Sequence, residues 1–168
     1  LIESIREPNP VVFFADLMLL GKKGDVPEGA YSIEFGKADV KREGTDVTVV
    51  AIGSTVPQAL EVADQLAETG VSVEVIDPRT LVPFDWDAVA KSVSKTGRLV
   101  AVDPNRETCG AASEIITQAV ERCWSQLKAQ PQRVTWPNVP MPYSPPLEKA
   151  VVSDLDDIRR AIELTLKS

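Results

Sequence analysis

From position 45 onward, continuous apolar runs alternate with segments in which apolar residues recur at helical spacing. Four short runs rich in β-branched residues predict strands that are buried on both faces. These runs are residues 46–53, 71–77, 98–103 and 132–136. Between and after them, apolar residues recur at the spacing of amphipathic helices. Strands that alternate with helices through short connections predict an α/β fold, a three-layer α/β/α arrangement around a mostly parallel sheet.

Capping signals mark the ends of the first two predicted helices. Thr55 and Gln58 fit a capping box at the start of the first helix, and Gly70 follows its last apolar position. Asp85 is a suitable cap for the second helix, and Gly97 stands beyond its end. The sequence therefore predicts one helix before the second strand and one helix after it along the chain.

Two further helices are predicted in the second half of the chain. The pattern from Ala112 to Leu127 is strongly amphipathic, and it places Trp124 on the apolar face. Ser153 and Asp156 fit a capping box at the start of the last helix, which is expected to run to about Leu166.

The first 44 residues lack this regular pattern. The apolar run from Val11 to Phe14 predicts a short strand after the turn at Asn9 and Pro10. Residues 20–44 combine glycines with many charged residues, which is typical of a surface linker, and we expect one short strand within 33–40.

Composition narrows the range of partners and chemistry. The chain has 168 residues, enough for one domain with a core, and a net charge of −7. The acidic balance argues against nucleic acid as a partner and suits a basic protein. No apolar run is long enough for a membrane helix, and no secretion signal opens the sequence.

The sequence contains no histidine, which removes the commonest general base, nucleophile partner and metal ligand. Its two cysteines, Cys109 and Cys123, have neither the spacing of a metal site nor the number needed for a disulfide framework. Free thiols of this kind suit a reducing compartment.

Two segments at predicted strand ends are candidate ligand sites. Gly53 lies between a strand and a helix, where backbone N–H groups can bind an anion, but we favour a tight turn because a full phosphate-binding motif is missing. Asp103 to Cys109 follow the third strand, at the kind of edge where α/β proteins bind ligands. No base is evident for Cys109, and Gly110 suits a close turn.

Two other segments have a structural interpretation beside the functional one. Asp77, Arg79, Asp85 and Asp87 include carboxylates for acid–base chemistry, but a helix cap and an ion pair within a loop account for them better. The proline-rich stretch 137–146 is either a polyproline ligand or, as we favour, a stiff loop that packs on the sheet or on a partner subunit.

Four segments resemble one known family in order along the chain. They are "NPVVFFADLMLLGKKGDVPEG", "IDPRTLVPFDWDAVAKSVSKTGRLVAVD", "GAASEI" and "RVTWPNVPMPYSPPLEKA". They are similar to the beta subunit of the first component of 2-oxoacid dehydrogenase complexes, the pyruvate, branched-chain and acetoin enzymes. Ala15 and Asp16 depart from the family, which often has Glu and then His or Pro at these positions.

The resemblance implies a division of the chain and a set of partners. Residues 1–16 are similar to the end of a pyrimidine-binding domain, residues 17–44 to a linker and residues 45–168 to a transketolase C-terminal-like domain of about five strands with one antiparallel edge. The family's thiamine diphosphate and magnesium are bound upstream, so we assign no catalytic, cofactor-binding or metal-binding residue here. Implied partners are an alpha subunit, a second beta subunit and the dihydrolipoyl acyltransferase core.

Three residues are candidate partner-binding positions: Lys128, Asp154 and Asp157. The family often has Asp at the position of Lys128, facing an Arg of the core's binding domain, so Lys128 would repel the familiar partner. The resemblance predicts a non-catalytic assembly and docking domain of an oxidoreductase, located in the cytoplasm or, in a eukaryote, the mitochondrial matrix. The alternatives are a stand-alone ligand-binding or regulatory domain with the same fold, or the corresponding domain of a transketolase or deoxyxylulose-phosphate synthase.

Overall fold

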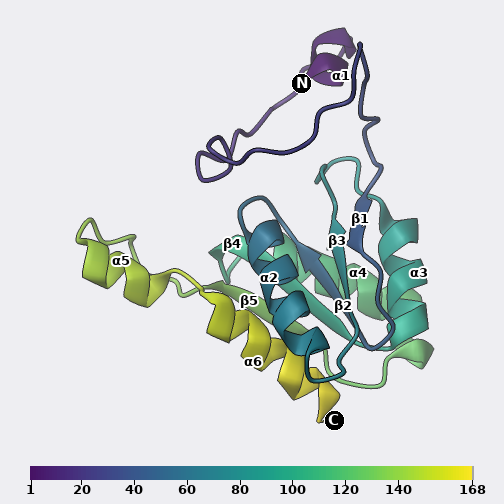
Figure 1. The fold of residues 1–168 in the computed structure, drawn as a ribbon, viewed down its shortest axis with the longest axis vertical. Coiled ribbons are helices and arrows are strands. Elements are labelled where there is room, and N and C mark those ends of the chain that lie inside the picture. Colours follow the sequence, from purple (N-terminus) through teal and green to yellow (C-terminus); the bar gives the residue numbers. More distant parts are fainter. Residues whose placement is uncertain (168) are drawn as a thin grey trace.

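A computed structural model describes residues 1–167, so Ser168, the last residue of the predicted C-terminal domain, lies outside the described residues. Its centre is a five-stranded sheet in the order β1-β3-β2-β4-β5 (Figure 1). The strands are β1 Asp39–Arg42, β2 Val47–Ala51, β3 Val73–Asp77, β4 Leu99–Arg106 and β5 Gln132–Trp136. β2, β3, β4 and β5 are parallel, whereas β1 pairs antiparallel with β3 at one edge. The predicted mostly parallel sheet with one antiparallel edge is confirmed.

Helices cover both faces of the sheet, which confirms the predicted three layers. The helices are α1 Ile2–Arg6, α2 Thr55–Ala67, α3 Trp86–Thr96, α4 Ala111–Cys123, α5 Pro145–Val151 and α6 Leu155–Leu166, with a 3₁₀ turn at Trp124–Gln126. α2 and α6 lie on one face, and α3 and α4 lie on the other (Figure 1). No helix within residues 1–167 is both long and apolar enough to cross a membrane.

Alternation along the central strand divides the core into two halves. All five residues of β2 are buried, yet Val49 packs with α2 and α6 whereas Val50 packs with α3 and α4. Successive strand side chains point to opposite faces, so a strand covered on both sides favours apolar residues at most positions. This explains why the strands appear in the sequence as continuous apolar runs.

The predicted ends of α3 are confirmed. Asp85 accepts a hydrogen bond from the Ala88 N–H at 3.1 Å, and its second oxygen accepts one from the Ala38 N–H at 3.0 Å. Gly97 has a left-handed φ of 75° and ends the helix, as expected for a glycine at this position. One aspartate therefore caps a helix and also holds the segment that enters β1.

The predicted caps of α2 and α6 are wrong in detail. Thr55 is already helical, and its hydroxyl donates to the Ile52 carbonyl at 2.8 Å instead of capping the helix. The capping box of α6 is formed by Asp154 and Asp157 rather than by Ser153 and Asp156. The Ser153 hydroxyl instead donates to a carbonyl of β5. The box of α6 is thus displaced by one residue, whereas the Ser54 side chain at the start of α2 makes no capping hydrogen bond.

Two apolar predictions also fail. Val11–Phe14 form no strand, because the segment lies away from the sheet and has no neighbouring strand to pair with (Figure 1). Trp124 is 74% exposed instead of facing inward. α4 ends at Cys123, and the 3₁₀ turn that follows interrupts the helical period before Trp124.

Gly44 provides a test of how closely the linker approaches the sheet. A Cβ atom at this position would lie 2.3 Å from the Glu74 nitrogen and 2.3 Å from the Val73 carbonyl carbon. We expect Gly44→Ala to lower the free energy of unfolding by about 1–3 kcal/mol in chemical denaturation, because two backbone segments must separate. Gly24→Ala is the matched control, since nothing lies within 4 Å of its Cβ position. Equal midpoints for the two variants would contradict this close packing.

Candidate functional site

The carboxyl edge of the sheet is the first place to look for a site, because open α/β sheets bind ligands there. β2 leads into α2 at this edge, and β4 leads into α4. The N-termini of these helices carry unpaired N–H groups and the positive end of the helix dipole. An anionic ligand would bind at these two points.

The position at α2 is occupied by a carboxylate of the chain itself. Asp16 accepts a hydrogen bond from the Ser54 N–H at 2.7 Å. Gly53 has a φ of +57°, and a Cβ atom there would lie 2.8 Å from the same carboxylate oxygen. Burial raises the pKa of Asp16, but hydrogen bonds from Ser54 and Met18 outweigh it and hold the pKa below its usual value. The turn at Gly53 therefore does receive an anion, and that anion is an aspartate side chain.

The position at α4 is occupied in the same way. Asp103 is 5% exposed and accepts a hydrogen bond from the Ala112 N–H at 3.1 Å. A Cβ atom on Gly110 would lie 2.5 Å from the Arg106 carbonyl oxygen, which confirms the interpretation of Gly110 as a close turn. Asp103 is therefore a helix cap, because its carboxylate is buried and accepts an N–H of the first turn of α4.

Other polar residues of this edge hold the proline-rich stretch. Arg106 donates to the Val139 carbonyl at 3.2 Å. The Asn138 side-chain amide donates to the Glu107 carboxylate at 3.1 Å and to the Thr108 hydroxyl at 2.6 Å. The cluster that the sequence offered as a ligand site thus anchors a loop, while Cys109 remains exposed with a φ of 60°.

The structural interpretation of the Asp77–Asp87 region is confirmed for its loop and its cap. The Arg79 N–H donates to Asp77 at 3.0 Å, and its guanidinium donates to Asp39 of β1 at 2.6 Å. The pKa of Asp39 is held below its usual value, mainly by the Lys41 ammonium and further by Arg79. Asp87 lies exposed in the first turn of α3, where a negative charge favours the helix dipole.

The sequence analysis missed a buried charged residue on β3, on the side of the sheet that α3 covers. Glu74 is 3% exposed, and its carboxylate binds the Lys95 ammonium and accepts the Gly44 N–H at 3.1 Å. Burial raises the pKa of Glu74, but hydrogen bonds from Lys95, Ser92 and Gly44 prevail and lower it overall. The hydrogen bond with Glu74 in turn raises the pKa of Lys95. The signal available in the sequence was a glutamate inside the apolar run of residues 73–77.

Hydroxyl groups extend this polar cluster beneath α3. The Thr48 hydroxyl lies 2.6 Å from the Ser92 hydroxyl and 2.8 Å from the Thr96 hydroxyl, and all three residues are buried. Such a network costs little only when every member is paired, so it specifies one position of α3 on the sheet. Its closed hydrogen bonding gives it a structural role.

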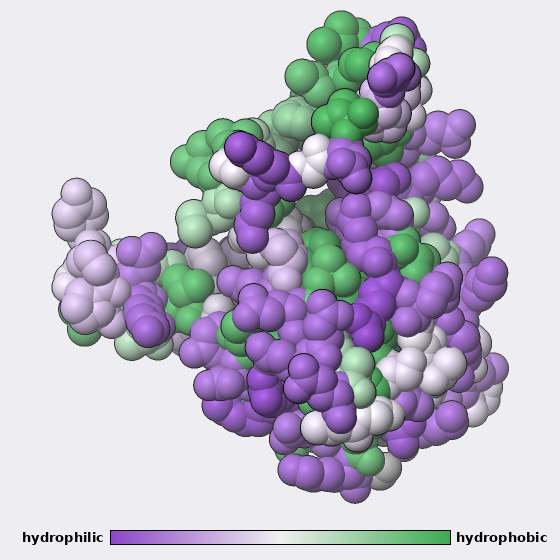
Figure 2. All heavy atoms as spheres, in the orientation of Figure 1, coloured by the Kyte–Doolittle hydropathy of each residue, from purple (hydrophilic) through white to green (hydrophobic). Residues whose placement is uncertain are grey.

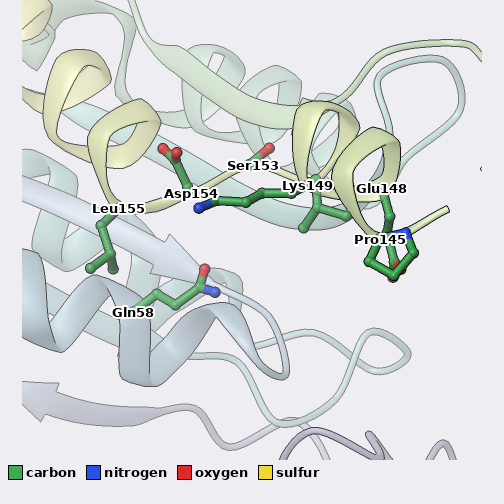
Figure 3. A pocket seen from close by; sticks show the side chains of 8 residues that line it. Gln58, Pro145, Glu148, Lys149, Ser153, Asp154 and Leu155 are labelled. Carbon is green, nitrogen blue, oxygen red and sulfur yellow. The ribbon is translucent and has the colours of Figure 1, made fainter.

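Two hollows open on the surface near α5 and α6. The first, of about 350 Å³, lies between α2, α5 and the start of α6, and the Gln58 and Lys149 side chains point into it (Figure 3). The second, of about 440 Å³, lies along β5 and α6. Within residues 1–167, no group of His, Cys, Asp and Glu is arranged to hold a metal ion. The charged residues of the first hollow, Glu148, Lys149 and Asp154, are exposed, whereas catalytic acids and bases are typically desolvated.

The three candidate partner-binding residues do not form one surface. Lys128 precedes β5; its stem covers Gly97 and its ammonium lies 3.4 Å from the Thr96 carbonyl at the end of α3. Asp154 and Asp157 follow β5 and cap the start of α6. The two groups therefore lie at opposite ends of β5, and each has a local structural role.

Comparison with known proteins places the domain. The family model "Transketolase, C-terminal domain" matches residues 36–158. This chain belongs to that family. This chain is 42% identical to the beta subunit of acetoin:2,6-dichlorophenolindophenol oxidoreductase from Cupriavidus necator. The match covers 99% of this chain and 49% of the relative. The chain is 40% identical to a mitochondrial pyruvate dehydrogenase E1 component subunit beta-1 from Arabidopsis thaliana, over 94% and 45% of the two chains.

A solved structure agrees with this assignment. The chain superimposes on a split gene transketolase, described as an inactive beta4 tetramer, with a TM-score of 0.67 and 26% identity, over 86% of this chain and 46% of that one. The resemblance to beta subunits of 2-oxoacid dehydrogenases is confirmed. This chain spans about half the length of the curated relatives it matches.

The Glu74–Lys95 pair makes a pH-dependent prediction. Because the folded pKa of Glu74 is lowered, its ionised form stabilises the fold above the unfolded pKa, and this contribution is lost as the pH falls through the folded pKa. In Lys95→Met the ammonium that offsets the desolvation of the Glu74 carboxylate is gone. The buried negative charge of Glu74 therefore destabilises the fold at neutral pH. We expect a loss of about 1–2 kcal/mol at neutral pH, less than for a fully buried pair because solvent screens the lysine.

This loss should shrink as the pH falls through the lowered folded pKa of Glu74, because the carboxylate is then protonated in both proteins. Denaturant unfolding at several pH values measures it, and Lys23→Met removes a lysine of the exposed N-terminal segment as the control. A deficit that stays the same at every pH would show that the lysine stem, and not its charge, is what matters.

Proposed function

We propose that this chain is the C-terminal assembly and docking domain of a thiamine diphosphate-dependent 2-oxoacid dehydrogenase beta subunit, and that it does not turn over alone. The observation that carries the proposal is the closed carboxyl edge. Asp16 and Asp103 occupy the N-termini of α2 and α4, where an anionic substrate or cofactor phosphate would otherwise bind. The chemistry of the intact enzyme is therefore assigned to other parts of the assembly.

Exposed apolar surface supports a docking role. Two parts of the chain extend from the domain: the N-terminal strap, residues 1–35, and the proline arm, residues 137–151 (Figure 1). In the strap Phe14 is 86% exposed, and in the arm Tyr143 is fully exposed. Figure 2 shows apolar side chains gathered on the strap. Clustered exposed apolar residues are typical of surfaces that other subunits cover.

The intact enzyme would decarboxylate a 2-oxo acid and transfer the acyl group to lipoamide. Its partners would be an alpha subunit, a second beta subunit and the dihydrolipoyl acyltransferase core. Thiamine diphosphate and magnesium would be bound in that assembly, since the described residues of this chain offer no metal-ligating group. The proposed location is the cytoplasm or, in a eukaryote, the mitochondrial matrix; the plant relative's name describes that protein as mitochondrial. In this proposal residues 1–16 are the end of a preceding pyrimidine-binding domain, residues 17–44 are a linker and residues 45–168 are the transketolase C-terminal-like domain.

The first test is the mass in solution by light scattering at several concentrations. We expect a dimer of twice 18.2 kDa, because apolar strap and arm surfaces favour self-association, as the tetrameric description of the split gene transketolase also suggests. The same sample, supplied with thiamine diphosphate, magnesium and pyruvate, should show no oxidative decarboxylation. A monomer at every concentration would contradict the assembly role, and turnover would contradict the non-catalytic role.

Lys128 tests docking to the acyltransferase core. We expect the isolated basic binding domain of that core to bind the wild-type chain weakly, and Lys128→Asp to bind it roughly tenfold more tightly, because a repelled arginine gains a partner. Titration calorimetry at low salt measures the change. Lys91→Asp on exposed α3 makes the same charge change elsewhere and serves as the control. Equal gains from both variants would mean that only net charge matters.

A further inference from the structure

Four of the helices begin against an aspartate carboxylate, and one of these carboxylates comes from a distant segment. Asp85, Asp103 and Asp154 lie within nine residues of the helix N–H groups whose hydrogen bonds they accept. Asp16 lies 38 residues from Ser54. The Ser54 N–H, just before α2, therefore has its partner in the N-terminal strap, and the strap is positioned by this contact with the turn that enters α2.

The strap has little else to hold it. Among the described residues, Ser54 is the only residue of 37–167 that forms a hydrogen bond with residues 1–35. No ion pair joins the two parts within residues 1–167. The apolar residues beside Asp16 do not compensate, since Leu17 is 79% and Met18 is 77% exposed. One carboxylate thus carries the polar attachment of a 35-residue segment.

The geometry of this carboxylate is specific. One oxygen of Asp16 accepts the Ser54 N–H at 2.7 Å, and the other accepts the Met18 N–H at 3.0 Å. The Asp16 carbonyl also accepts the Leu19 N–H at 3.0 Å, which closes the turn that follows. Gly53 leaves the space that the carboxylate fills, because a Cβ atom would lie 2.8 Å from it. Asp16 shapes the strap and binds the turn that enters α2 at the same time.

We propose that Asp16 is a releasable latch, which holds the N-terminal strap at the carboxyl edge of the sheet through its contact with the start of α2. Release of this contact frees the strap as a unit and uncovers the Ser54 N–H, which immediately precedes α2. A charge-assisted hydrogen bond is strong enough to favour the latched state and weak enough for a binding partner to shift the balance. The latch operates whether or not the chain has the function proposed above.

Hydrogen exchange of the full chain tests the latch. In Asp16→Ala we expect the Ser54 amide to lose protection roughly tenfold, the scale of a lost helix cap, and the Met18 amide to lose protection as well. The buried Val49 amide should exchange as in the wild type. Asp25→Ala is the control, because Asp25 is an exposed acid of the same strap. Unchanged Ser54 protection in Asp16→Ala would overturn the proposal.

A distance measurement follows the strap itself. Cys109 is exposed at the carboxyl edge whereas Cys123 is buried, so a spin label reacts with Cys109 and with a second cysteine in Val12→Cys. We expect one narrow distance distribution in the Asp25→Ala background and a broad one with Asp16→Ala. Equally narrow distributions in both backgrounds would show that something other than Asp16 holds the strap.

A double-mutant cycle separates the latch from general damage to α2. Gly53→Ala should destabilise the protein partly because its new methyl group displaces the Asp16 carboxylate. In the Asp16→Ala background this collision is absent, so Gly53→Ala should reduce Ser54 protection severalfold less than in the wild type. Additive effects would overturn the proposed contact, even if each single variant were less protected.

Discussion

The unpaired N–H groups at helix N-termini are the constraint on which the rest of this structure depends. A parallel sheet directs the helix that follows each strand to start at the same edge, so orphan donors and positive dipole ends gather there. In this chain aspartate carboxylates meet that demand: Asp103 at α4, Asp154 at α6 and Asp16 at α2. The edge that commonly holds a ligand is therefore satisfied from within.

That internal satisfaction explains why the domain has the features of a scaffold. Residues that looked like a site, such as Arg106 and Glu107, fix the proline arm through Val139 and Asn138. Large apolar residues are instead exposed on the strap (Figure 2) and on the arm. Charged groups thus build the frame, and apolar groups are left exposed on the strap and the arm, where the proposed docking role would use them.

A buried polar cluster joins the linker to this frame. Glu74 receives the Gly44 N–H and the Lys95 ammonium, and the hydroxyls of Thr48 and Ser92 continue the network under α3. Because each of these groups would be costly if left unpaired, they allow one arrangement of linker, strand and helix. The strap lacks such a network, and this difference in anchoring is why the strap is the part of the chain that can be released.

The sequence by itself determined the α/β class, the four parallel strands and the principal helices, because strand and helix periods and caps such as Asp85 are local signals. It also carried the family resemblance in its linear order. Only the tertiary structure decided that Asp16 binds the Ser54 N–H before α2, that Glu74 is buried with Lys95, and that Val11–Phe14 is no strand. Those outcomes depend on which distant groups meet in space: a carboxylate finds a donor 38 residues away, and an apolar run becomes a strand only beside another strand.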